Sequence, residues 1–171
     1  MFTLTERVTI SAAATETFAT IDLGSYVDVG DRQALQVHSV DYITQGTTAS
    51  ESLINSVGQD ASIDAQITDL NRGGLVFAND RALVSSMRLL VDQGNNQLTA
   101  ESDIYPDNYG KGSDDGRYVV NDALYVTART SHLDTANNKE LNITVRVNAS
   151  IVTLSQKDFM AIAIQSTAAD N

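Results

Sequence analysis

Residues 140–152, ELNITVRVNASIV, alternate between apolar and polar side chains over their whole length. Side chains point to opposite faces along a β-strand, so a period of two predicts a strand with one buried and one solvated face. The polar positions carry Asn, Thr, Arg, Asn and Ser. We expect the apolar side chains to face a core between two sheets; they include Ile143, Val145, Val147 and Ile151.

Several other segments have the same period, and the composition is rich in Thr and Val, which suit a pleated surface. These predicted strands cover residues 4–12, 17–23, 34–44, 62–70, 97–102 and 118–131. Residues 75–77 predict a very short strand. Residues 81–93 fit a helix or a strand, and we favour a strand because 94–96 form a tight-turn sequence before a partner strand.

Two helices are expected. A short one begins near Ser50 and stops at Gly58. The other has about ten residues near the end of the chain, where Ser155 and Asp158 resemble a capping box. Phe159, Ile162 and Ala163 would then share one face of this C-terminal helix.

About eight strands without intervening helices exclude a sheet built from parallel βαβ units. The alternation predicts an all-β fold, an antiparallel two-sheet β-sandwich. Eight strands with long connections favour a single jelly roll with a short C-terminal helix. The length of 171 residues predicts one domain over 1–171, with a polar insert loop at about 103–117.

The charge of the chain limits its partners. It has 22 Asp and Glu against 11 Lys and Arg, a net charge of -11. Such a surface repels phosphate backbones and anionic lipids, so we expect no direct nucleic-acid binding. No apolar stretch approaches the roughly 20 residues of a membrane helix, so no membrane insertion is expected. The first residues lack the pattern of a signal peptide.

The polar insert holds the candidate metal ligands. Asp107, Asp114 and Asp115 could supply carboxylate oxygens to Ca²⁺. Their spacing does not match the calcium loop of helix–loop–helix proteins, and a solvated loop of turn-forming residues is the alternative. No other cofactor is predicted.

Catalytic patterns are missing from the sequence. His38 and His132 have no partners at the spacing of a zinc or acid–base site, and no G-x-S-x-G motif occurs. We therefore predict that the protein is not an enzyme. Asn142 and Asn148 each start a glycosylation pattern, which we interpret as a by-product of a solvated strand face. Such short, uncharged side chains also suit packing against a neighbouring subunit.

The order of these parts resembles single jelly-roll viral capsid proteins. The similarity lies in an initial strand without a leader, successive alternating strands, the insert at 103–117, and a final hairpin within 123–151 that leads to a short helix. It implies a structural subunit that assembles with copies of itself into a homo-oligomeric shell, with other structural proteins as further candidate partners. The implied location is the virion, after synthesis in the host cytoplasm. Many such proteins carry a basic N-terminal arm, whereas residues 1–16 contain only Arg7.

A β-sandwich binding module is the alternative function. It would recognise a carbohydrate or another ligand with calcium-supported loops, and Tyr105 and Tyr109 are its candidate aromatic contacts. The absence of Trp and the aromatic content of 6% argue against a stacking platform for sugars.

Overall fold

The computed structural model describes residues 1–28, 30–100, 107–108 and 116–167. Its ten strands are β1 (Phe2–Ile10), β2 (Thr17–Asp22), β3 (Gln33–Gln45), β4 (Ala61–Thr68), β5 (Leu83–Asp92), β6 (Gln97–Ala100), β7 (Asp107–Asn108), β8 (Arg117–Val119), β9 (Ala123–Thr130) and β10 (Leu141–Thr153). Its helices are α1 (Leu53–Val57), the 3-10 helix η1 (Thr135–Asn137) and α2 (Gln156–Thr167).

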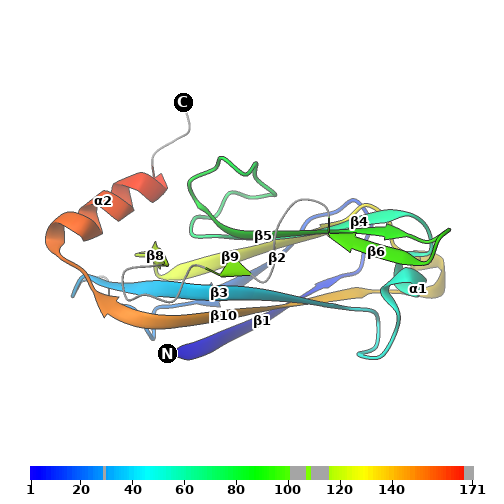
Figure 1. Cartoon of the computed structure of the whole chain (residues 1–171), viewed down its shortest axis with the longest axis horizontal. Helices are drawn as coiled ribbons and strands as arrows, with labels where there is room; N and C mark the ends of the chain where they lie inside the picture. The colour runs from blue at the N-terminus through cyan, green and yellow to red at the C-terminus, as the bar shows by residue number, and fades with distance from the viewer. Residues whose placement is uncertain (29, 101–106, 109–115, 168–171) are drawn as a thin grey trace.

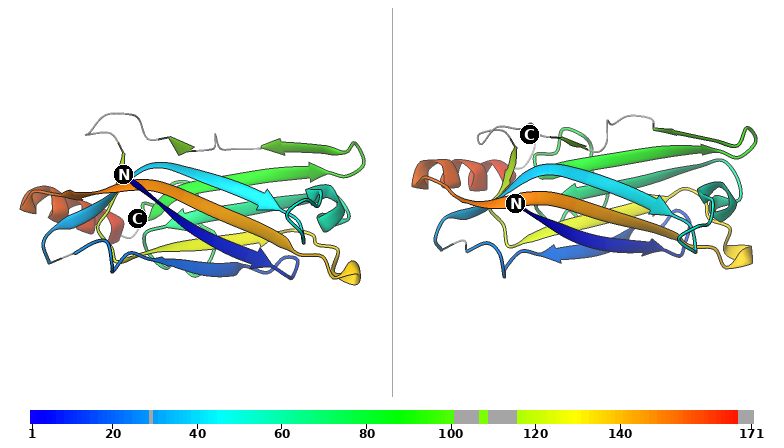
Figure 2. Two further views of the ribbon diagram at one scale, coloured as in Figure 1. Left: turned by 90° about the horizontal axis from the view of Figure 1, so that it is seen from below. Right: turned by 60° about the horizontal axis from the view of Figure 1, so that its bottom comes forward.

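The strands form two antiparallel sheets that pack face to face (Figure 1). The first sheet has the order β1-β10-β3-β7, and β8 also pairs with β3. The second sheet has the order β2-β9-β4-β5-β6. Figure 2 shows the first sheet in front, with the long strand β10 between β1 and β3. The predicted antiparallel β-sandwich is confirmed.

The pairing of strands has the form of one long hairpin that is rolled up. β1 pairs with β10, β2 with β9, β3 with β7 and β8, and β4 with β5. Successive pairs belong alternately to the first and the second sheet, and the contacts of β10 with β3 and of β9 with β4 complete both sheets. This strand order is that of a jelly roll.

The core lies between the two sheets and consists of the side chains at every second position of each strand, which point inward. On β10, Ile143, Val145 and Val147 are fully buried, as the alternation predicts. Ile151 is only partly buried, because it lies near the end of the sandwich and packs against the margin of the core. From the opposite sheet, Ile63 and Ile67 of β4 are fully buried in the same cluster.

Both predicted helices are present, at opposite ends of the sandwich (Figures 1 and 2). α1 starts at Leu53, later than expected, and ends at Gly58, whose φ of 74° suits glycine. At the start of α2, the Ser155 hydroxyl accepts a hydrogen bond from the Asp158 N–H (3.2 Å) and donates one to the Asp158 carboxylate (2.6 Å). The predicted inner face of α2 is half-buried, whereas Met160 is exposed.

The ambiguous segment 81–93 is a strand, β5, and β6 is its hairpin partner across the predicted turn. Residues 75–77 are not a strand. They belong to the β4–β5 loop, because the backbone of Val76 bonds to the side chain of Gln66 and not to a neighbouring strand.

The predicted strand 118–131 is divided into β8 and β9, which lie in different sheets. The chain crosses between the sheets at residues 120–122, and there the Asn121 side chain donates a hydrogen bond to the Asp69 carbonyl (2.6 Å). The predicted final hairpin within 123–151 is also wrong. β9 and β10 lie in opposite sheets, because each pairs with a strand from the first half of the chain.

The buried parity of β10 gives a first prediction. Val145→Asp places a charge without a partner in the core, which costs several kcal/mol, so the variant should not fold into soluble protein. Thr144→Asp is the matched control on the outer face and should stay within about 0.5 kcal/mol of the parent. The yield of soluble protein is compared for both variants, and chemical denaturation measures the free energy of unfolding of whatever is soluble. A Val145→Asp protein with the parent's free energy of unfolding would contradict this placement.

Candidate functional site

The outer face of the first sheet is covered by a network of short polar side chains. The Thr3 hydroxyl donates a hydrogen bond to the side-chain Oδ1 of Asn148 (2.7 Å), and the side-chain Nδ2 of Asn148 donates one to the Ser39 hydroxyl (2.9 Å). Asn148 therefore joins β1, β10 and β3. Asn142 repeats this arrangement, accepting from Thr9 (2.8 Å) and donating to the Gly46 carbonyl (2.9 Å). Asparagine recurs on β10 because an amide on a central strand can bond to both neighbours.

This face carries few charges. Among the outward positions of β1, β10 and β3, only Arg7, Arg146 and Asp41 are charged. Asp41 lies opposite Arg146 in the register. The net charge of the chain is -11, yet the outward positions of these three strands hold a single acidic residue. The Asn, Thr and Ser side chains among them are short and already held by hydrogen bonds, so covering them costs little conformational entropy.

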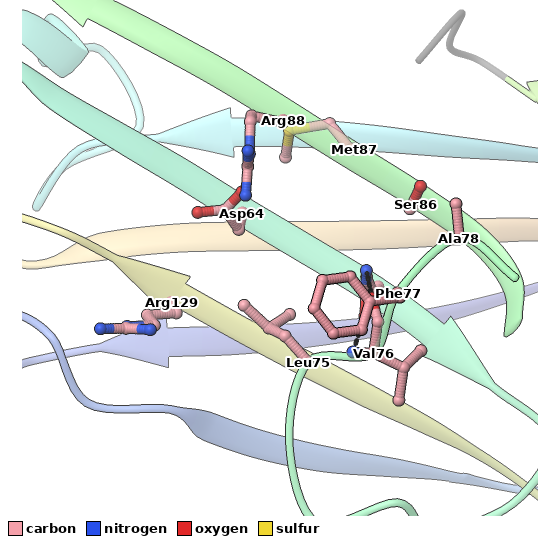
Figure 3. Close-up of a pocket in the computed structure, with 10 residues that line it drawn as sticks. Asp64, Leu75, Val76, Phe77, Ala78, Ser86, Met87, Arg88 and Arg129 are labelled. Atoms are coloured by element: carbon pink, nitrogen blue, oxygen red, sulfur yellow. Dashed lines mark hydrogen bonds and ion pairs between the residues drawn. The ribbon is translucent and has the colours of Figure 1, made fainter. Parts of the chain in front are cut away.

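The outer face of the second sheet differs, because the β4–β5 loop lies across it. The loop and the sheet enclose a hollow of about 410 Å³ (Figure 3). We call this the outer hollow, and define it by Asp64, Gln66, Leu75, Phe77, Arg88 and Arg129.

The loop is fixed to the sheet by its polar groups. The Gln66 side-chain amide accepts from the Val76 N–H and donates to the Val76 carbonyl, both at 2.8 Å, and so mimics a neighbouring strand. Glu16 accepts from the Leu75 N–H at 3.3 Å. Within the loop itself, Arg72 near its start pairs with Asp80 near its end at 2.9 Å. Phe77, which is 87% exposed, lies between these attachments.

The charges of the outer hollow come from three neighbouring strands. Asp64 on β4 lies opposite Arg88 on β5 and Arg129 on β9. Arg88 forms an ion pair with Asp64, which also accepts a hydrogen bond from Ser62 at 3.2 Å. Within the described part of the chain, no hydrogen bond or ion pair engages the Arg129 guanidinium. The side chains that line the hollow are thus two arginines and one aspartate, with the Glu16 carboxylate at the edge beside Leu75, and Arg129 is the cation that no hydrogen bond or ion pair engages.

A smaller cavity of about 190 Å³ lies between α2 and the base of the same loop. It is lined by Asp69, Arg117 and Ile162, among others. The Asp69 side chain is only 2% exposed, and its Oδ2 lies 3.6 Å from Nη2 of Arg117. The Asp69 Oδ1 and the Arg117 Nε are buried without hydrogen-bond partners. Burial raises the pKa of Asp69 to about 6, while the positive charges of Arg117 and Arg72 oppose the shift.

The predicted calcium ligands are only partly within the described chain. The backbone of Asp107 belongs to β7 and pairs with Val40. Asp114 and Asp115 lie outside the described residues, as do Tyr105 and Tyr109, so the calcium site stays a prediction. In the described ranges, no group of three His, Cys, Asp or Glu side chains is placed to hold a metal ion.

Sequence patterns did not identify the outer hollow. Residues 75–77, LVF, suggested a very short strand, and an exposed Phe in a short apolar run cannot be distinguished from a core residue by its period alone. The proximity of Asp64, Arg88 and Arg129 follows only from the strand register. Given that register, the two cross-strand charge pairs could have been found.

The sequence matches no protein-family model and no curated protein. No helix in the described part of the chain is long and apolar enough to cross a membrane.

Asp69 gives a prediction about pH. Its pKa is raised in the folded state, from 3.8 to about 6, so the protonated form favours folding and stability should fall as the pH rises through about 4 to 6, by up to about 3 kcal/mol. Asp69→Asn stays neutral at every pH. We expect it to raise the free energy of unfolding at pH 8 and to flatten this part of the pH dependence.

The measurement is urea denaturation of the parent and of Asp69→Asn at pH 4.5 and pH 8. Asp122→Asn, the same change at an exposed position, is the control. If Asp69→Asn lowered stability at pH 8, the Asp69–Arg117 attraction would outweigh the cost of burial, contrary to this account.

Proposed function

We propose that this chain is a structural subunit that assembles with copies of itself, and specifically a viral capsid protein that forms the virion shell. The observation that carries the proposal is the rolled-up pairing of β1 with β10, β2 with β9, β3 with β8 and β4 with β5. This jelly-roll order is the architecture of many capsid subunits, and it also occurs in lectin domains and cupins.

Two surface features favour assembly among these functions. The outer face that β1, β10 and β3 form has one acidic residue, Asp41, at its outward positions, and hydrogen bonds already hold its Asn, Thr and Ser side chains. The second sheet presents Phe77 at 87% exposure on a loop that is bonded to the sheet at Val76 and joined to itself by the Arg72–Asp80 pair. Aromatic residues that are held in place before binding are typical anchors of protein–protein contacts.

A ligand-binding module is the second candidate. The outer hollow favours it, since about 410 Å³ with an apolar wall and an arginine side chain is within the size range of small-molecule sites. Such a module would function without forming shells.

The charge of the chain predicts how assembly should respond to salt. Copies with 22 acidic and 11 basic residues repel one another, and salt screens this repulsion. We therefore expect particles that form without nucleic acid and become more stable as the ionic strength rises. Light scattering and the ratio of absorbance at 260 and 280 nm, measured on purified protein across a salt series, test this.

Particles that require nucleic acid and dissolve at higher salt would contradict the expected mechanism, because counterion release would then drive assembly. A protein that stays monomeric under every condition would contradict self-assembly and leave the binding module.

A further inference from the structure

We propose that the outer hollow is a contact site for a second copy of this chain, which contributes a carboxylate to Arg129 and packs an apolar surface against Phe77. This inference rests on the proposed self-assembly and names the surface through which it occurs.

Phe77 is the apolar anchor of this contact. It is the most exposed large aromatic side chain of the described residues, yet the residue before it, Val76, is bonded to Gln66 of the sheet, and the Arg72–Asp80 pair within the loop joins the segments on either side of the ring. A partner that covers Phe77 gains apolar burial without having to order the loop first. A ring this exposed does little for the folded monomer, so its position is explained better by a contact.

The apolar wall continues below the ring. Leu75 and Val76 are half-buried beside the hollow, and their backbone groups are already bonded to Glu16 and Gln66. A partner side chain entering here meets apolar atoms and displaces no backbone hydrogen bond. The volume of about 410 Å³ admits side chains of a partner surface, because recognition sites begin at about 300 Å³.

Charge complementarity identifies the occupant as a second copy. Asp64 is already paired with Arg88, whereas Arg129 is half-buried and has no partner among the described residues. A half-buried guanidinium gains most from a carboxylate, which it can bind with two parallel hydrogen bonds. Copies of this chain present such groups at high density, with 22 acidic residues against 11 basic ones.

The proposed contact joins two different surfaces, a hollow that presents the Arg129 guanidinium and an acidic surface of the next copy. A contact of this heterologous kind continues from copy to copy, and it closes into rings when the rotation between copies allows. It therefore supplies the repeated joint that a shell needs. A symmetric pairing of two hollows would place the two Arg129 side chains near one another and is disfavoured.

Charge and ring variants with matched controls test the proposal. Arg129→Glu and the milder Arg129→Gln remove the cation, and Arg32→Glu and Arg32→Gln make the same charge changes at an exposed turn that does not line the hollow. Phe77→Ala removes the ring, and Leu98→Ala truncates another exposed apolar side chain, on β6. Thermal unfolding of the unassembled proteins verifies that each variant folds.

The readout is the protein concentration at which particles form, followed by light scattering. We expect Arg129→Glu and Phe77→Ala to raise this concentration at least about tenfold, the effect of losing one strong contact residue, and the controls to stay within about twofold. Arg129 and Phe77 variants that assemble like the parent would overturn the site while leaving self-assembly intact. A parent protein that never assembles would overturn both.

A second readout keeps Phe77 in place. The chain has no cysteine, so Ala78→Cys introduces one thiol beside the ring, and Leu98→Cys introduces one on β6. Alkylation of Cys at position 78 should slow at least about tenfold in particles relative to the monomer, because a neighbouring copy covers the hollow. Equal rates in particles and monomer would show that the hollow is open in the assembly, as a small-ligand site would be, and would overturn the proposal.

Discussion

The structure depends on the pairing of β10 with two strands from the first half of the chain. β10 lies between β1 and β3, so its backbone groups are used on both edges and one of its faces closes the core. A shift of one residue would move Val145 and its neighbours to the outer face and the polar residues into the core. This constraint explains why the alternation of residues 140–152 is so regular. It also explains why outward positions of β10 hold Asn142 and Asn148, whose side-chain amides bond to residues on both sides of the strand.

The rolled-up pairing also decides which surfaces are left for contacts. Both sheets bury one face against each other, so function has to reside on the outer faces, the edges or the connections. The outer face that β1, β10 and β3 form has one acidic residue, whereas the second sheet carries a loop bonded to Gln66, with Phe77 beside a hollow that holds Arg129. A proposed shell subunit can use both faces. On the first, side chains already held by hydrogen bonds lose little entropy when they are covered. On the second, the loop is already bonded to the sheet, so a partner does not have to order it.

Local pattern was sufficient to predict the strands and the sandwich, because a buried face imposes its period on each strand separately. It was insufficient where the outcome depends on distant partners. The run through Val119 and Val120 continues the apolar pattern across a change of sheet, so β8 and β9 were predicted as one strand. The Gln66 side chain makes the two hydrogen bonds to the backbone of Val76 that a neighbouring strand would otherwise make. The pattern of apolar and polar residues gives no sign of such a contact. The outer hollow needs the register of three strands before its charges come together.

Electron cryo-microscopy of the purified protein tests the central claim most directly. The account predicts closed particles or rings of repeated jelly rolls, with the outer hollow of each subunit covered by an acidic surface of its neighbour. Images that contain only single subunits, even at high protein concentration and high ionic strength, would contradict the proposed function. Regular particles in which the loop around Phe77 faces open solvent would retain the shell but contradict the assigned contact.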